Sequence, residues 1–198
     1  MGMFFRHVRM VLLLCATATV ASTSTAQRAE SFSVIEVRLS EVTNLHSGAL
    51  HAHWNLGNGL ELAFATPIPV GFLELGTAVH RYEPRVGRPG LTALWLYAGW
   101  GGRLRVADWF GVSVSARLGN YRMTFDDEEA EFRGVLTESE LGRMFASSVD
   151  LQISGPLSII ASAGHIRVYT RQRLSLWFAS AGLRYKLRTP EGLKTFLR

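Results

Sequence analysis

Hydrophobic and polar residues alternate along most of the chain from residue 33 onward, with a period of two instead of the 3.6 of a helix. The segment 94–106 shows the pattern at its longest. Leu, Ala, Trp, Gly and Val occupy one face of this segment, whereas Trp95, Tyr97, two glycines, Arg103 and Arg105 occupy the other. The alternation predicts β-strands with one apolar face and one face that is mostly small or charged.

Turn signals divide the alternating region into eight expected strands: 33–44, 58–66, 70–82, 91–106, 109–125, 142–154, 157–169 and 174–188. Three connections are tight, and the other four are longer or more polar. An even number of strands with short turns at one end and longer loops at the other is typical of outer-membrane barrels. We therefore predict an all-β fold, an eight-stranded antiparallel up-and-down transmembrane β-barrel.

The placement of charge decides which face of the barrel points inward. Ten charged residues lie on the less apolar face of the strands: Glu36, Arg38, Glu61, Glu74, Arg103, Arg105, Arg117, Asp150, Arg184 and Lys186. In a soluble exported barrel that binds an apolar ligand, these residues would lie outside among many Gly, Ala and Ser. In a membrane barrel they lie inside a narrow tube, where four acids and six bases can pair. The membrane barrel is favoured, and it predicts an interior charge network that plugs the lumen.

The first segment has the features of a cleaved export signal. Arg6 and Arg9 precede a short apolar stretch, and small residues lead to Ala26 before a plausible cut. We therefore expect a signal peptide over 1–26, a barrel over 27–188 and a short periplasmic tail over 189–198. Removal of the signal also removes the single cysteine, which suits export to an oxidising compartment.

Composition excludes several other classes of protein. Hydrophobic residues make up 47% of the 198, charged residues make up 19%, and the formal net charge is +5. Such a chain is neither disordered nor a disulfide scaffold. The excess of basic residues invites nucleic-acid binding, but many of them alternate into the barrel interior and no expected helix carries a basic stripe. We expect no nucleic-acid partner.

The last expected strand carries a further signal. Ser180, Gly182, Tyr185 and Leu187 resemble the C-terminal assembly signal of bacterial outer-membrane barrels, and RLRVADWFGVSVSARLG is similar to hairpins of the small OmpA/OmpX/OmpW-like barrel group. The resemblance implies the outer membrane of a Gram-negative bacterium and insertion by the barrel assembly machinery. It also implies contact with outer-membrane lipids and lipopolysaccharide, and a monomer. Unlike the usual signal, this one is followed by a tail, which is too short for a peptidoglycan-binding domain.

Candidate chemistry is sparse in this sequence. His46, His51 and His53 invite a metal, but they lack the remaining ligands of a structural site, so we expect neither metal nor cofactor. The pairs that could support catalysis are His165 with Ser162 and His80 with Glu83. The first pair should point to opposite faces of its strand. We expect no enzyme, with a lipid-modifying outer-membrane enzyme as the alternative.

One loop is strongly acidic. The segment 126–141 holds seven of the sixteen acidic residues and is expected to be a solvated loop, with divalent-cation binding left open. Basic residues offer a plainer route to lipid phosphates in the outer leaflet: Arg81, Arg85 and Arg88.

Overall fold

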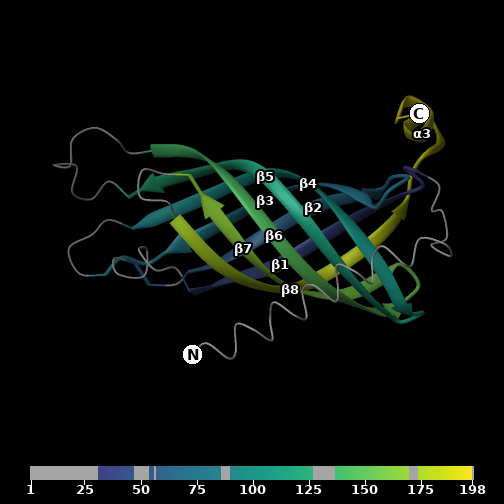
Figure 1. Cartoon of the computed structure of the whole chain (residues 1–198), viewed down its shortest axis with the longest axis horizontal. Coiled ribbons are helices and arrows are strands. Elements are labelled where there is room, and N and C mark those ends of the chain that lie inside the picture. The colour runs from purple at the N-terminus through teal and green to yellow at the C-terminus, as the bar shows by residue number, and fades with distance from the viewer. Residues whose placement is uncertain are drawn as a thin grey trace.

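The computed structural model describes residues 31–46, 54–55, 57–85, 90–126, 137–169 and 174–197. The expected signal peptide, His51, His53, Arg88 and most of the acidic loop lie outside these residues. The fold is a closed antiparallel barrel in which each strand pairs with its neighbours in the sequence and the last strand pairs with the first (Figure 1). Its eight strands are β1 (Val34–His46), β2 (Asn58–Pro67), β3 (Phe72–Tyr82), β4 (Leu91–Ala107), β5 (Phe110–Phe125), β6 (Thr137–Ser154), β7 (Leu157–Val168) and β8 (Leu174–Arg188). The predicted fold class is confirmed.

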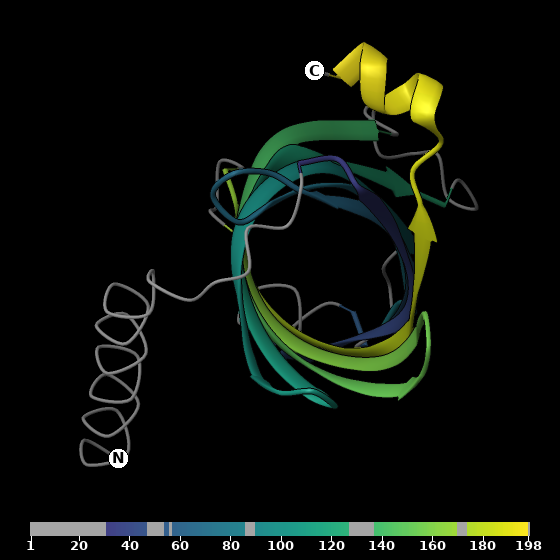
Figure 2. The ribbon, with the colours of Figure 1, turned by 90° about the vertical axis from the view of Figure 1, so that its right-hand side faces the viewer.

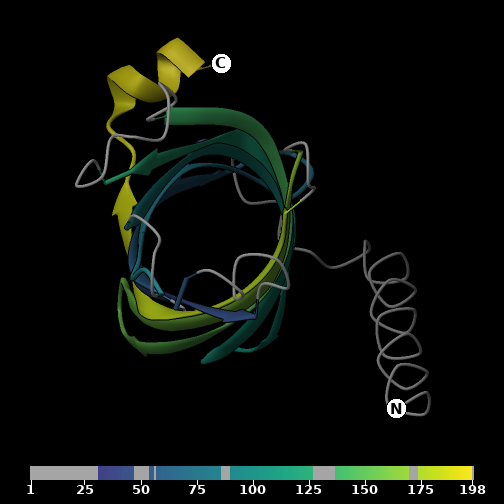
Figure 3. The ribbon, with the colours of Figure 1, turned by 90° about the vertical axis from the view of Figure 1, so that its left-hand side faces the viewer.

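The two ends of the barrel differ. At one end, which we call the turn end, lie the short connections after β2, β4 and β6 together with the start of β1 and the end of β8 (Figures 1 and 2). Gly71 (φ 86°) and Gly155 (φ 41°) give two of these turns a left-handed residue, which glycine adopts without steric cost. At the opposite end, which we call the loop end, β1, β3, β5 and β7 finish and β2, β4, β6 and β8 begin. The strands surround a common axis in both end views (Figures 2 and 3).

Two elements differ from the sequence prediction. Strand β6 begins at Thr137, five residues earlier than expected, because its ladder with β5 continues up to the pair Thr124 and Thr137. Glu138 and Glu140 therefore belong to a strand and not to the acidic loop. The expected tail contains a seven-residue helix, α3 (Glu191–Leu197), next to the turn end (Figure 1). No helix in the described ranges is long and apolar enough to cross a bilayer.

The outer surface of the barrel is apolar. Large side chains that are between 37% and 62% exposed alternate with inward residues on the strands, and they include Leu60, Leu62, Phe64, Leu75, Leu96, Leu118, Phe145 and Leu183. A protein in water rarely exposes apolar surface on this scale. In a bilayer, the same surface contacts lipid and the closed ladder leaves no unpaired strand edge. This arrangement argues against the soluble exported barrel.

Candidate functional site

The middle of the lumen is crossed by two glutamates and two arginines. The Oε1 atom of Glu61 accepts hydrogen bonds from Arg38 Nη2 at 3.2 Å and from Arg117 Nη1 at 2.9 Å. Glu74 lies on the neighbouring strand, where it accepts from Arg38 and forms an ion pair with Arg117 Nη2 at 3.1 Å. The side chain of Glu74 is 1% exposed and that of Arg117 is 4% exposed. Each carboxylate thus contacts both guanidinium groups deep inside the barrel.

Tyr97 completes this middle layer. Its hydroxyl group donates to Glu61 and lies 3.2 Å from Glu74 Oε1. The guanidinium carbon of Arg117 lies 4.9 Å from the centre of the Tyr97 ring, within the range of a cation–π contact. The strand period places Tyr97 on the same face as Arg103 and Arg105, but nothing in the sequence pattern indicates its role.

A second group of charges lies closer to the turn end. Arg103 binds Glu36 with two hydrogen bonds of 2.6 Å, one to each carboxylate oxygen. Arg184 donates to Asp150, and its Nη1 atom lies 3.8 Å from Glu36 Oε2. Bidentate arginine–carboxylate pairs are the strongest and most directional ion pairs in proteins. This group therefore fixes the long arginine side chains inside the tube.

Eight of the ten predicted interior charges are brought together in ion pairs, and we call them the charge network: Glu36, Arg38, Glu61, Glu74, Arg103, Arg117, Asp150 and Arg184. The network has four acids and four bases, so its formal charge is zero. Arg105 is exposed and forms no ion pair within the described part of the chain. Lys186 contacts Gln152 Oε1 at 3.5 Å instead of a carboxylate.

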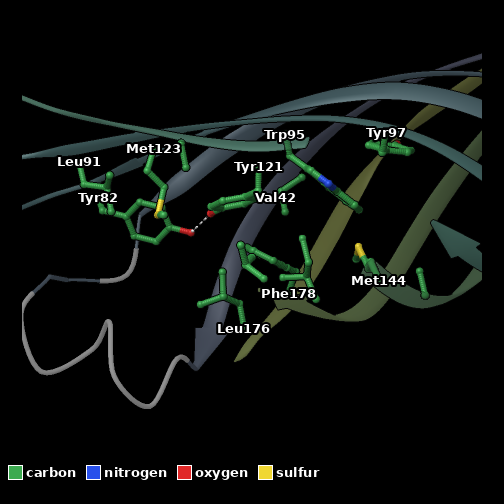
Figure 4. Close-up of a cluster of buried hydrophobic side chains, with 14 of the residues drawn as sticks. Val42, Tyr82, Leu91, Trp95, Tyr97, Tyr121, Met123, Met144, Leu176 and Phe178 are labelled. Carbon is green, nitrogen blue, oxygen red and sulfur yellow. Dashed lines mark hydrogen bonds between the residues drawn. The ribbon is translucent and has the colours of Figure 1, made fainter. Parts of the chain in front are cut away.

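Above the charge network, toward the loop end, the interior is apolar and aromatic. We call this region the aromatic cluster; its main members are Tyr82, Leu91, Trp95, Tyr121, Met123, Leu176 and Phe178, all at most 5% exposed (Figure 4). This half differs from the sequence expectation of a polar interior. Inward and outward side chains still alternate along the strands in this region. Both sets are apolar, however, so the residue types no longer distinguish the inner face from the outer one.

Few polar groups enter the aromatic cluster. The hydroxyl groups of Tyr82 and Tyr121 lie 3.3 Å apart (Figure 4). The Asn44 amide donates to the Tyr82 hydroxyl at 3.4 Å. His80 is buried inside the barrel with its ring stacked on Phe178, at 4.8 Å between centres. The sequence offered His80 with Glu83 as a pair that could support catalysis. The structure separates them, because His80 is buried inside the barrel whereas Glu83 is exposed beyond the end of β3.

Two small cavities flank the middle layer. One, of about 20 Å³, is bordered by Trp95, Phe178, Glu61 and Arg117; the other, also of about 20 Å³, is bordered by Glu36, Arg103, Ser113 and Arg184. Each is about the size of one water molecule. Neither is large enough for an organic ligand.

The four residues of the expected assembly signal occupy both faces of β8. Tyr185 and Leu187 point outward and are 46% and 45% exposed near the turn end. Ser180 borders the cavity that Trp95 and Phe178 also line. A Cβ atom added at Gly182 would lie 2.1 Å from the Leu39 carbonyl oxygen, so a larger residue there would disturb the β1–β8 pairing.

The other pair considered for catalysis, His165 with Ser162, is not formed. Ser162 borders the interior cavity, whereas His165 is on the outer surface, as the strand period predicted. The His165 Nε2 atom instead lies 2.7 Å from the Ser175 hydroxyl oxygen on β8. Across the described residues, no group of three or more histidine, cysteine or acidic side chains is arranged to hold a metal ion.

A closed antiparallel barrel with an apolar outer surface and an ion-paired interior defines the class of small transmembrane β-barrels. No family model and no curated protein matches the sequence.

Solved structures with a similar fold include Neisserial surface protein A, with a TM-score of 0.61, 12% identity, and coverage of 80% of this chain and 100% of that one. The N-terminal barrel domain of Pseudomonas aeruginosa OprF gives 0.54 and 11% over 80% of this chain and 100% of that domain. The outer-membrane protein OprG of Pseudomonas aeruginosa gives 0.52 and 12% over 82% and 99%. The fold is thus that of the small eight-stranded outer-membrane barrels.

Proposed function

We propose that this chain is a monomeric outer-membrane barrel of a Gram-negative bacterium that acts through its surfaces, as a structural or surface-interaction protein, and not by transport or catalysis. The observation that carries the proposal is the middle layer of Arg38, Glu61, Glu74 and Arg117. These side chains meet across the lumen, and the cavities on either side have room for about one water molecule each. An eight-stranded barrel has an interior that its own side chains fill.

The test of this plug is conductance. The full chain, refolded in detergent and checked by its heat-modifiable migration on a gel, is inserted into planar bilayers. We expect no stable open channel at neutral pH. Long-lived steps of the size that porins give would contradict the plugged interior and assign the barrel to solute passage.

The location and the route of insertion form the second part of the proposal. Tyr185 lies on the outward face near the turn end, so it meets lipid at the periplasmic boundary and provides an apolar position of the assembly signal. Lys186 points into the barrel. A charge on the lipid face costs more than one in the lumen, where arginines are available to pair with it.

The two positions make a matched pair of variants. We expect Tyr185→Asp to lower the amount of protein in the outer membrane several-fold, and Lys186→Asp to have a smaller effect. The measurement is membrane fractionation combined with protease protection. A greater loss for Lys186→Asp would show that the strand faces the other way.

A lipid-modifying enzyme is the second candidate, and one contact favours it. The His165 imidazole and the Ser175 hydroxyl lie 2.7 Å apart on the outer surface, and a histidine base next to a serine is the starting point for acyl transfer. Such a dyad also needs a third group that orients the imidazole. In the described ranges His165 has no carboxylate partner; its other contact is the Trp177 ring, at 4.6 Å.

Mass analysis of lipid A from cells with the native chain, the Ser175→Ala variant and no chain distinguishes the two candidates. We expect three identical lipid A patterns. A change in acylation that requires Ser175 would establish the enzyme.

A further inference from the structure

Two arginines face each other on the outside of the barrel. Arg143 on β6 and Arg167 on β7 are directly opposite in the strand register, and both side chains are exposed. Neither forms an ion pair or a hydrogen bond through its side chain to any other described residue. Like charges at directly opposed positions repel each other and destabilise a sheet. All four arginines of the charge network are paired with carboxylates, so this outer pair stands apart.

The surroundings of the pair are those of a membrane boundary. Arg143 lies over the Tyr169 ring, with 5.5 Å from its guanidinium carbon to the ring centre. Toward the turn end, the next outward residues are Phe145 on β6, His165 on β7 and Trp177 on the adjacent β8, of which Phe145 is 62% and Trp177 is 51% exposed. Below them the outward positions are apolar or small. Aromatic side chains followed by arginines mark the level at which lipid acyl chains give way to headgroups.

Among the described residues, no acidic side chain pairs with either arginine, so the pair is open to an anionic ligand. We propose that Arg143 and Arg167 form a binding site for a phosphate group of lipopolysaccharide, on the lipid A part, in the outer leaflet. Two adjacent guanidinium groups match the charge and the several oxygens of a phosphate monoester. The Ser175 hydroxyl, opposite Arg167 on β8, lies at the same level and offers a further polar contact.

The position of the site favours a lipid over free phosphate. A phosphate held between Arg143 and Arg167 would leave the attached acyl chains directed at Phe145 and Trp177, which are large, apolar and exposed. Inorganic phosphate would gain nothing from these side chains. The inference rests on the proposed outer-membrane location and adds to it a specific lipid and a specific place on the barrel.

The test counts bound lipid. The full chain in detergent micelles is mixed with diphosphoryl lipid A, and bound molecules are counted by native mass spectrometry. The variant Arg143→Gln/Arg167→Gln is compared with the control Arg105→Gln/Arg122→Gln. The control removes the same charge from two exposed arginines that lie opposite Gly111 and Ser139 instead of another arginine.

We expect the native chain and the control to bind one lipid A with affinities within about twofold of each other, and the Arg143/Arg167 variant to bind at least about tenfold more weakly. Lipid A with its phosphates removed should bind equally weakly to all three. Excess inorganic phosphate should not displace the lipid. If the double variant fails to fold, the single variant Arg167→Gln replaces it, with an expected loss of several-fold.

Three outcomes would overturn the inference: equal lipid A binding by the native chain and the Arg143/Arg167 variant, equal loss in the control, or displacement by inorganic phosphate. Heat-modifiable migration and conductance are recorded for every variant. A folded, non-conducting barrel that binds lipid A independently of the pair would refute this site alone. A conducting native barrel would refute the proposed plug alone.

Discussion

The charge network and the aromatic cluster fill the same tube by different means. In the turn-end part, four acids and four arginines close the lumen through directional contacts, with two hydrogen bonds of 2.6 Å between Arg103 and Glu36 as the clearest case. In the loop-end part, rings and aliphatic chains pack together with few polar contacts. The inward side chains of a small barrel can therefore fill the lumen either by ion pairing or by apolar packing.

The difference between the two regions lies in what a lost side chain leaves behind. Loss of a carboxylate from the charge network leaves buried guanidinium groups without a counter-charge, which costs far more than the ion pair itself contributes. Loss of a side chain from the aromatic cluster leaves a cavity, whose cost depends on its volume and on how well its walls collapse. Changes in the two regions should therefore differ in size, and urea unfolding of the refolded barrel in lipid vesicles can compare them.

The largest expected effect is at Glu61. Glu61→Ala removes the shared acceptor of Arg38, Arg117 and Tyr97. We expect the free energy of unfolding to fall by about 3–5 kcal/mol, because two buried guanidinium groups lose a partner. The matched control is Glu138→Ala, an exposed acid near the start of β6, with an expected change below about 0.5 kcal/mol. Equal small losses at both positions would show that the charge network does not stabilise the barrel.

Next in size is a cavity in the aromatic cluster. Leu176 is fully buried, and Leu176→Ala should lower the free energy of unfolding by about 2–4 kcal/mol. The comparison is Leu183→Ala on the same strand, whose side chain is 52% exposed on the outer face, where lipid can fill the space left behind. We expect that second loss to be less than half the first. The reverse order would place the lipid on the other face of β8.

A carboxylate on the outer surface tests the same contrast from outside. Glu41 points outward on β1 between Leu60 and Ala181 and forms no ion pair with any described residue. Glu41→Leu should raise the free energy of unfolding by about 1–2 kcal/mol, because an acid on the lipid face is unfavourable. Glu36→Leu, on the inner face of the same strand, should lower it. Unfolding in vesicles measures both changes, and equal signs would refute the assigned faces.

The smallest effect concerns the hydroxyl pair of Tyr82 and Tyr121 in the aromatic cluster. Tyr121→Phe removes the contact with Tyr82 but keeps the ring, so we expect a loss of about 1 kcal/mol. Tyr82 retains Asn44 as a partner. A loss as large as that of Glu61→Ala would mean that the aromatic cluster depends on polar contacts as strongly as the charge network does.

The alternation of residues predicted the eight strands, the barrel and the inward face, because a period of two follows directly from strand geometry. Three features were out of reach. In the aromatic half of the lumen, both faces of the strands carry apolar residues, so the alternation does not show which face points inward. The contact of His165 with Ser175 and the placement of Arg143 opposite Arg167 depend on strand register, which the sequence does not specify by itself. The role of Tyr97 depends on residues from three other strands.

The pairing of β1 with β8 also has a consequence for how the chain reaches its final state. Val34 lies opposite Arg188, so the ladder that closes the barrel joins segments from the two ends of the strand region. Until β8 is in place, β1 and β7 each have a bare edge that can recruit strands from other molecules. Contacts between such distant segments also form slowly. A chain cut after β7 should therefore not form a smaller barrel but aggregate, and the native chain must be shielded until its last strand arrives.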